Sequence, residues 1–231
     1  MTPKKDAKTL ILETLKEKAC LKQKVFKQTI EIFQDFKAQG EELVNDLKSE
    51  MEKVDTDVLI EFINKSDHEF HIKFGGDILV FYMHTNVFDF EKSHSIWNSS
   101  YLREDELRVY CGMINVYNFL ADSFKYNRVN DIGYLVARCF FNKDKHYFVE
   151  GKRQLGFLYN DFINEVISNE KIRQIIESAI LYSMDFDLLT PPYSTMQEVS
   201  VHDIIEATNA MSIKTGKRLG FKFQTDNDFV E

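Results

Sequence analysis

Between residues 12 and 54, apolar residues recur every three or four positions. This spacing places them on one side of a helix and predicts a single long amphipathic helix. The apolar stripe consists of Leu12, Leu15, Ala19, Phe26, Ile30, Phe33, Leu43, Leu47, Met51 and Val54. A helix of about 45 residues spans roughly 65–70 Å, whereas the rest of the chain would form a domain with a radius of gyration of about 16 Å. We therefore expect the helix either to pair with another chain or to break, with Gly40 as a candidate hinge.

After residue 56 the pattern changes to alternation of apolar and polar positions, which predicts β-strands. Alternating runs at 58–62 and 70–74 are separated by turn-forming residues, and a glycine-containing turn precedes the apolar run at 78–82. This arrangement is typical of an antiparallel β-meander. Residues 91–106, which include the only tryptophan, Trp97, are expected to form an exposed loop.

The segment 109–119 fits two periods. Met113, Val116 and Leu120 follow helical spacing, but the β-branched and aromatic residues of the segment favour a strand. Because Gly112 and the neighbouring asparagines disfavour a helix, we predict a strand here. A clear hairpin follows, with its turn at residues 142–145.

From Arg153 onward the helical period returns. It predicts one helix through Leu155 and Phe162 and a second helix, with Ser168 as its N-cap, that ends before Pro191. The remaining elements are a short strand at 198–201, a helix at 203–211 and a strand at 217–223. The predicted fold class is α+β, with a long N-terminal amphipathic helix (1–53) followed by an antiparallel β-sheet domain covered by helices (54–231).

Composition narrows the class of protein. The net charge of −8 argues against a general nucleic-acid-binding protein, because such proteins are usually basic. The chain has no uninterrupted apolar run of about 18 residues, so we expect no membrane-spanning helix. The three cysteines are far apart in the sequence, which favours reduced thiols and a cytoplasmic protein.

The charges along the predicted helix are unevenly distributed. Residues 1–27 contain eight lysines and three acidic residues, whereas residues 28–53 contain three lysines and seven acidic residues. Two antiparallel copies would place each basic half beside an acidic half. We therefore expect a homodimer formed through this helix, although solvated charges are an equally good interpretation.

Histidines and cysteines give little support for catalysis. His68 and His71 are three positions apart on a predicted strand, so their side chains point to opposite faces and cannot share a metal ion. Cys111 would need His84 or His146 nearby as a base, and we expect it to be a small buried apolar residue instead. We predict no catalytic residue, no metal ligand and no cofactor.

A locally basic stretch provides the candidate binding site. Residues 125–153 carry a net charge of +4 in a chain whose total is −8. Arg138 interrupts an apolar strand, and Glu150, Lys152 and Arg153 lie where a strand passes into a helix. Such a junction suits a phosphate or carboxylate group. The alternative is that Arg138 pairs with Glu150 across the hairpin and the lysines are solvated.

We interpret the sequence as a non-enzymatic cytoplasmic regulatory or interaction module. It would dimerise through its N-terminal helix and bind a protein partner or a small anionic ligand. The alternative is an enzyme of unfamiliar type, a hydrolase or phosphotransfer enzyme, with its site near the 138–154 hairpin. No catalytic motif supports this second interpretation.

Overall fold

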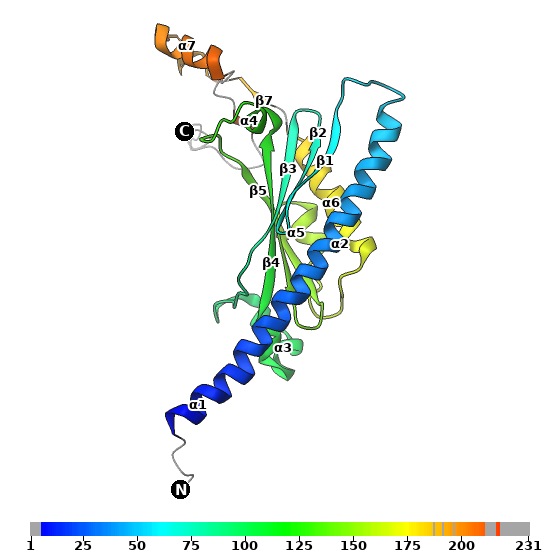
Figure 1. Cartoon of the computed structure of the whole chain (residues 1–231), viewed down its shortest axis with the longest axis vertical. Helices are drawn as coiled ribbons and strands as arrows, with labels where there is room; N and C mark the ends of the chain where they lie inside the picture. The colour runs from blue at the N-terminus through cyan, green and yellow to red at the C-terminus, as the bar shows by residue number, and fades with distance from the viewer. Residues whose placement is uncertain (1–5, 187, 191, 196, 211–215, 218–231) are drawn as a thin grey trace, which may run out of the picture.

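The computed structural model has a long helix lying diagonally across an antiparallel sheet (Figure 1). The residues that it describes are 6–186, 188–190, 192–195, 197–210 and 216–217. The N-terminal helix is continuous from Ala7 to Met51 and comprises α1 (Ala7–Thr14), a π-helical turn (Leu15–Ala19) and α2 (Cys20–Met51). The predicted α+β class is therefore confirmed.

Within the described residues, six strands form one sheet in simple meander order, each antiparallel to the next. The strands are β1 (Ile60–Ser66), β2 (Glu69–Phe74), β3 (Asp77–Met83), β4 (Cys111–Leu120), β5 (Tyr134–Asn142) and β6 (Tyr147–Gly151). The predicted meander and the predicted hairpin are both present, and the ambiguous segment 109–119 forms most of strand β4.

The helices after β4 are all much shorter than the N-terminal helix, and α6 is the longest of those described. They are α4 (Ala121–Lys125), α5 (Gln154–Leu158), α6 (Asn169–Met184) and α7 (Val201–Ala210). Ser168 caps α6 as predicted, because its side chain accepts a hydrogen bond from the backbone N–H of Lys171. The helix expected to continue to Phe162 is confined to α5.

One predicted strand near the C-terminus is wrong. Residues 198–200 have no regular structure, and Val201 is already the first residue of α7. The short strand in this region is instead β7 (Leu188–Leu189), which pairs antiparallel with β8 (Gly216–Lys217). Four residues of alternating sequence are too weak a signal to identify a strand, because a strand also needs a partner to pair with. The rest of the predicted strand 217–223 lies outside the described residues.

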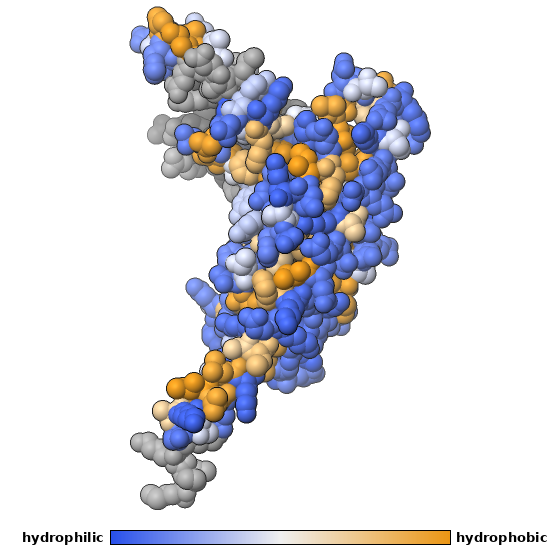
Figure 2. Space-filling view, in the orientation of Figure 1, coloured by the Kyte–Doolittle hydropathy of each residue, from blue (hydrophilic) through white to orange (hydrophobic). Residues whose placement is uncertain are grey.

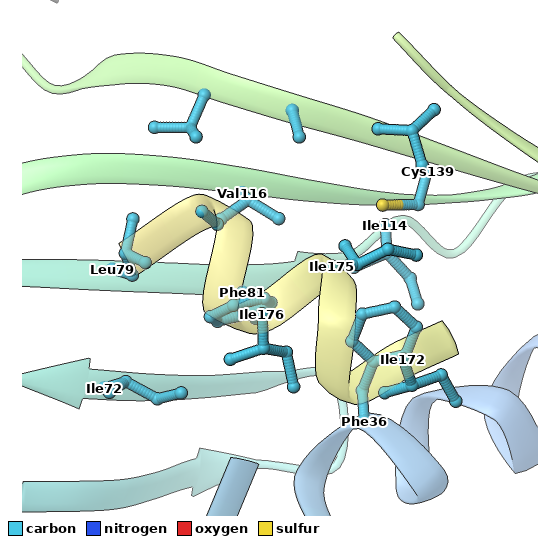
Figure 3. Packing of buried hydrophobic residues seen from close by; sticks show 14 of the residues in the cluster. Phe36, Ile72, Leu79, Phe81, Ile114, Val116, Cys139, Ile172, Ile175 and Ile176 are labelled. Carbon is cyan, nitrogen blue, oxygen red and sulfur yellow. The ribbon is translucent and has the colours of Figure 1, made fainter. Parts of the chain in front are cut away.

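Helices α2 and α6 cover one face of the sheet and form the main core with it (Figure 3). Phe36 from α2 packs near Phe81 and Phe141, with ring centroids 6.3 and 6.1 Å apart. Ile175 and Ile176 from α6 are fully buried in the same cluster. The apolar side of α2 is thus part of the core of the sheet domain.

Glycines permit the close approach of α2 to the sheet. Gly40 is not a hinge, because α2 passes through it without a break and buries it against Phe62, Phe70 and Ile72. At Gly112, the Cβ atom of any larger residue would lie 1.9 Å from the Thr29 Oγ1 atom of α2. The two backbones can therefore approach at this point only because β4 has no side chain there.

A buried lysine connects α2 to the edge strand β1 by hydrogen bonds. The Lys37 side chain is only 8% exposed. Its Nζ atom donates to the Asn64 side-chain oxygen at 3.0 Å and to the Ser66 carbonyl at 2.6 Å. The burial of this charge is compensated by these contacts.

The prediction that residues 91–106 form an exposed loop is wrong. This segment contains a 3-10 turn (Ser95–Asn98) and α3 (Ser100–Glu104), and it buries Ile96, Tyr101 and Leu102. These residues form a second apolar cluster with Phe140 and Phe148, on the face of the sheet opposite α6. Scattered apolar residues in an irregular segment give no period from which burial could be predicted.

Candidate functional site

A group of exposed apolar side chains lies on the N-terminal part of the long helix, Ala7–Lys24, which we call the projecting helix. The projecting helix extends beyond the sheet (Figure 1). The first buried residue of the long helix is Val25, which directly follows this segment. Four large apolar side chains lie on it, namely Leu10 (49% exposed), Ile11 (59%), Leu12 (46%) and Leu15 (52%). They form the apolar patch at the N-terminal end of the molecule in Figure 2.

The projecting helix has a well-defined start. The backbone N–H of Thr9 donates to the Asp6 carboxylate at 2.9 Å, which is the usual arrangement of an N-cap. The same hydrogen bonding lowers the pKa of the Asp6 carboxyl. The Asp6 carboxylate is ionised at neutral pH, and its negative charge also interacts favourably with the positive end of the helix dipole. A segment that makes few contacts with its own domain is therefore stabilised locally as a helix.

A shallow depression of about 550 Å³ runs along one side of the projecting helix and the first turn beyond it. Its described lining is Leu15, Ala19, Cys20, Gln23, Lys24 and Lys27. These residues follow helical spacing, and a hollow between rows of side chains is where a second helix inserts its own ridge. The depression begins at the π-helical turn Leu15–Ala19, an uncommon local structure that is often found at functional sites.

The charged residues of the long helix, apart from the buried Lys37, are exposed as well. Lys16, Lys18 and Lys24 are exposed on the projecting helix, and Glu31 and Asp35 are exposed on α2. The basic and acidic halves read from the sequence therefore both face solvent. The basic half also carries the four exposed residues Leu10, Ile11, Leu12 and Leu15, whereas the acidic half exposes Leu47 to 38%.

Arg138 and Glu150, two of the predicted binding residues, lie side by side. They are direct neighbours on β5 and β6 and form an ion pair. The His94 Nε2 atom lies 3.6 Å from the other carboxylate oxygen of Glu150. Arg138 is on the same side of β5 as Phe140, which is the face opposite α6.

The other two predicted residues, Lys152 and Arg153, lie at the end of β6 towards α6. Arg153 has a positive φ of 50° and forms an ion pair with Asp185, which directly follows α6. Lys152 and Arg153 line a depression of about 260 Å³ together with Leu181. The structure therefore brings together Arg138 with Glu150 and Arg153 with Asp185, and it separates the two pairs. Ligand binding by any of them stays a prediction.

Two of the three cysteines are unsuited to nucleophilic chemistry. Cys111 and Cys139 are fully buried, and burial raises the pKa of Cys139 to about 12 and that of Cys111 at least as strongly. Thiols of this kind stay protonated and inert at neutral pH. Cys20 is exposed and lines the depression on the projecting helix. In the part of the chain that the structure describes, no three histidine, cysteine or carboxylate side chains are grouped as a metal site would need.

Leu10 and Ile11 were missing from the stripe read from the sequence. The signal was available, because Leu10, Ile11 and Leu12 are consecutive and successive residues of a helix point about 100° apart. Three consecutive apolar residues cannot fit one narrow stripe. They indicate a helix that is apolar over a wide arc and therefore needs a broad partner surface.

Known proteins give no guide to this site. In the described residues, no helix has the length and apolar character needed to cross a membrane. No family model, no curated protein and no solved structure matches this chain. The function must therefore be inferred from the geometry of the chain itself.

Proposed function

We propose that this protein is a cytoplasmic interaction module that dimerises through its projecting helix and thereby performs a regulatory or scaffolding role. The observation that carries this proposal is the group of exposed apolar residues Leu10, Ile11, Leu12 and Leu15 on a helix that extends away from its own core. A second copy of the long helix can cover these residues, and in a symmetric pair both copies of the group are covered at once.

The expected dimer is weak. Completing the burial of each half-exposed leucine or isoleucine contributes about 1 kcal/mol, half of the value for full burial. The sum over both copies is comparable with the cost of association, which is roughly 4–15 kcal/mol. The interface is also short, since the projecting helix is only about 27 Å long. A reversible dimer that responds to protein concentration is the expected behaviour, which suits a regulatory role.

An antiparallel pair centred on Cys20 combines apolar and charged contacts. In this register Leu10 of one helix lies level with Ile30 of the other, and Ile30 is only partly buried in its own domain. Lys27 lies level with Glu13, which supplies opposite charges near the ends of the pair. Near its centre, however, Lys16 lies level with Lys24 and Lys18 with Lys22, which weakens the pair. The depression that contains Cys20 lies at the centre.

Light scattering on the full chain tests dimerisation. The variant Ile11→Lys with Leu15→Lys should be monomeric at concentrations where wild type is dimeric, because lysines replace the apolar contact. Val129→Lys is the matched control, since Val129 is 80% exposed and lies outside the helix. A chain starting at Cys20 should behave like the lysine variant and still contain every buried residue of α2. Monomeric wild-type protein throughout the tested range would refute the proposal.

Mild oxidation tests the register without any substitution. Cys20 is exposed and the other two cysteines are buried, so a cross-linked dimer reports on Cys20 alone. A disulfide forms only where the two Cα atoms come within about 7 Å. Rapid cross-linking, abolished in Cys20→Ser, supports an antiparallel crossing at Cys20. A dimer that resists cross-linking would exclude this register and leave dimerisation itself intact.

Binding of a small anion at Lys152 and Arg153 is the second function that we propose. The depression that both residues line supports it. Asp185 pairs with Arg153 and would have to share that arginine with the ligand. The alternative of an enzyme near the 138–154 hairpin gains no support, because Arg138 and Glu150 are paired with each other.

A further inference from the structure

A broad groove lies at the end of the sheet where β2 turns into β3. It has a volume of about 770 Å³ and lies between the start of β1, the β2–β3 turn and α4. We call it the hairpin groove. Its apolar lining consists of Val58, Leu59, Ile63, Ile78, Leu120, Ala121, Phe124 and Leu188. This volume is in the range of small-molecule sites, which are mostly apolar with few polar groups.

The charged residues that line the hairpin groove balance each other. The acidic residues among them are Asp57, Glu61 and Asp122, and the basic residues are Lys73, Lys125 and Arg128. Glu61 and Lys73 form an ion pair at 3.0 Å. A groove with balanced charges and an apolar floor favours a neutral ligand over an anion or a cation.

His71 lies at one end of this groove, behind two of its lining residues. It is opposite Ile63 on β1 and opposite Val80 on β3, and the Phe124 ring stands edge-on to it with centroids 5.1 Å apart. The side chain is 1% exposed. Its Nε2 atom is 2.6 Å from the Glu69 carboxylate, and among the described residues its Nδ1 atom has no hydrogen-bond partner.

The contact with Glu69 defines the chemistry of the other nitrogen. A carboxylate accepts hydrogen bonds, so Nε2 carries the proton and donates. Burial lowers the pKa of His71, which keeps the ring neutral at pH 7. Nδ1 is therefore an unprotonated acceptor, buried and unsatisfied, and such groups in native proteins usually have a partner such as a ligand or an ordered water.

We propose that the hairpin groove binds a neutral, mostly apolar small molecule whose single N–H or O–H group donates to His71 Nδ1. Phe124 is the residue that must move for this contact to form. It is 44% exposed and belongs to the five-residue helix α4, and turning its ring outward breaks its edge-on contacts with His71 and Phe119. The proposal does not depend on dimerisation, because the groove and the projecting helix share no residues.

A matched pair of probes tests the donor requirement on the full chain. Indole and benzothiophene have nearly the same size and shape, but only indole carries an N–H donor. Calorimetric titration should show saturable binding of both, with indole binding roughly threefold to tenfold more tightly, the usual range for one neutral hydrogen bond. His71→Leu should remove this preference and keep apolar binding. His202→Leu, at an exposed histidine on α7, should retain it.

Nitrogen NMR of the histidine rings provides a readout that does not rely on a variant folding correctly. Indole should shift the His71 Nδ1 resonance of the wild-type protein upfield and leave Nε2 nearly unchanged, whereas benzothiophene should leave both in place. Equal affinities for the two probes, or an unmoved Nδ1 resonance at saturation, would mean that an ordered water satisfies Nδ1 and would overturn the proposal. No saturable binding of either probe would overturn it as well.

Discussion

The first and second parts of the N-terminal helix have a similar spacing of apolar residues but different environments. From Val25 to Val44 most apolar residues are buried against the sheet, and Phe33 and Phe36 are fully inaccessible. From Ala7 to Ala19 the apolar residues stay exposed, and Leu21 is only partly buried against the second apolar cluster. The difference shows that the period of apolar residues determines a helix and its apolar side, but not the surface that will cover that side.

The width of the sheet explains where burial stops. Six strands about 4.8 Å apart span roughly 24 Å between the outermost strands. The segment from Val25 to Val44 spans about 29 Å along the helix axis. The sheet can therefore cover about this length, and the first turns of the helix necessarily extend beyond it.

Truncating a large apolar residue in each environment should give the largest contrast. Phe36→Ala removes a ring that packs near Phe81 and Phe141, and it should lower the free energy of unfolding by about 3–5 kcal/mol. Leu12→Ala on the projecting helix should change it by less than about 0.5 kcal/mol. Urea unfolding at low protein concentration, where dimers dissociate, measures both. Similar losses would mean that the projecting helix is packed within the monomer.

The beginning of the buried half depends on Gly112. Gly112→Ala places a methyl group where the Thr29 side chain lies, and overpacking of this kind should destabilise the protein by about 2–3 kcal/mol. Thr29→Ala in the same chain should restore part of the loss, because it removes the nearest atoms. Gly76→Ala is the control, since a Cβ there meets nothing within 4 Å. Thermal unfolding of the four proteins is the measurement, and a lack of rescue would place the strain elsewhere.

A buried and an exposed lysine give a second comparison between the packed and the projecting parts of the helix. Lys37→Met leaves the Ser66 carbonyl without its buried donor and should cost about 2 kcal/mol of unfolding free energy. Lys16→Met on the projecting helix replaces an exposed lysine and should change stability by less than about 0.5 kcal/mol. Chemical denaturation tests the pair. A neutral Lys37→Met would indicate that methionine packing fully compensates for the lost hydrogen bonds.

A fall in pH should affect the two regions differently, because all six histidines follow residue 67 and none lies on the projecting helix. Burial lowers the pKa of His71 below its ordinary value of 6.5. As the pH falls below 6.5, the unfolded chain takes up a proton before the folded chain does, so stability decreases. One such group contributes at most about 1.4 kcal/mol per pH unit. The loss of stability ends once the pH is below the pKa of His71 in the folded protein.

Comparing unfolding at several pH values in wild type and His71→Leu measures this contribution. The variant should have a flatter dependence between pH 6.5 and the folded pKa. Substitutions on the projecting helix should leave the slope unchanged. An identical slope in wild type and His71→Leu would show that His71 titrates normally.

The smallest effect on stability is expected at the predicted anion site. Lys152→Ala with Arg153→Ala should change the unfolding free energy by less than about 1 kcal/mol, because exposed ion pairs contribute little. If the site binds anions, the double variant should lose the thermal shift that inorganic phosphate causes in wild type. Arg138→Ala is the control that should retain the shift. Absence of any shift in wild type would remove this site.

Several features of the fold were predictable because they depend on neighbours along the chain. The hairpin that pairs Arg138 with Glu150 follows from its turn, and the Ser168 cap follows from the start of the helical period. The interpretation of Gly40 as a hinge failed because its role is a contact with β2, distant in sequence. The burial of residues 91–106 was missed for the same reason.

By itself, the sequence determined the long helix, the meander and the α+β class, because these follow from backbone geometry and the spacing of apolar residues. Only the tertiary structure decided which part of the apolar stripe is covered and that Arg153 pairs with Asp185 instead of joining Arg138. It also decided that His71 is buried with an unsatisfied nitrogen. These outcomes depend on the size of the sheet and on contacts between distant segments, which local periodicity does not encode.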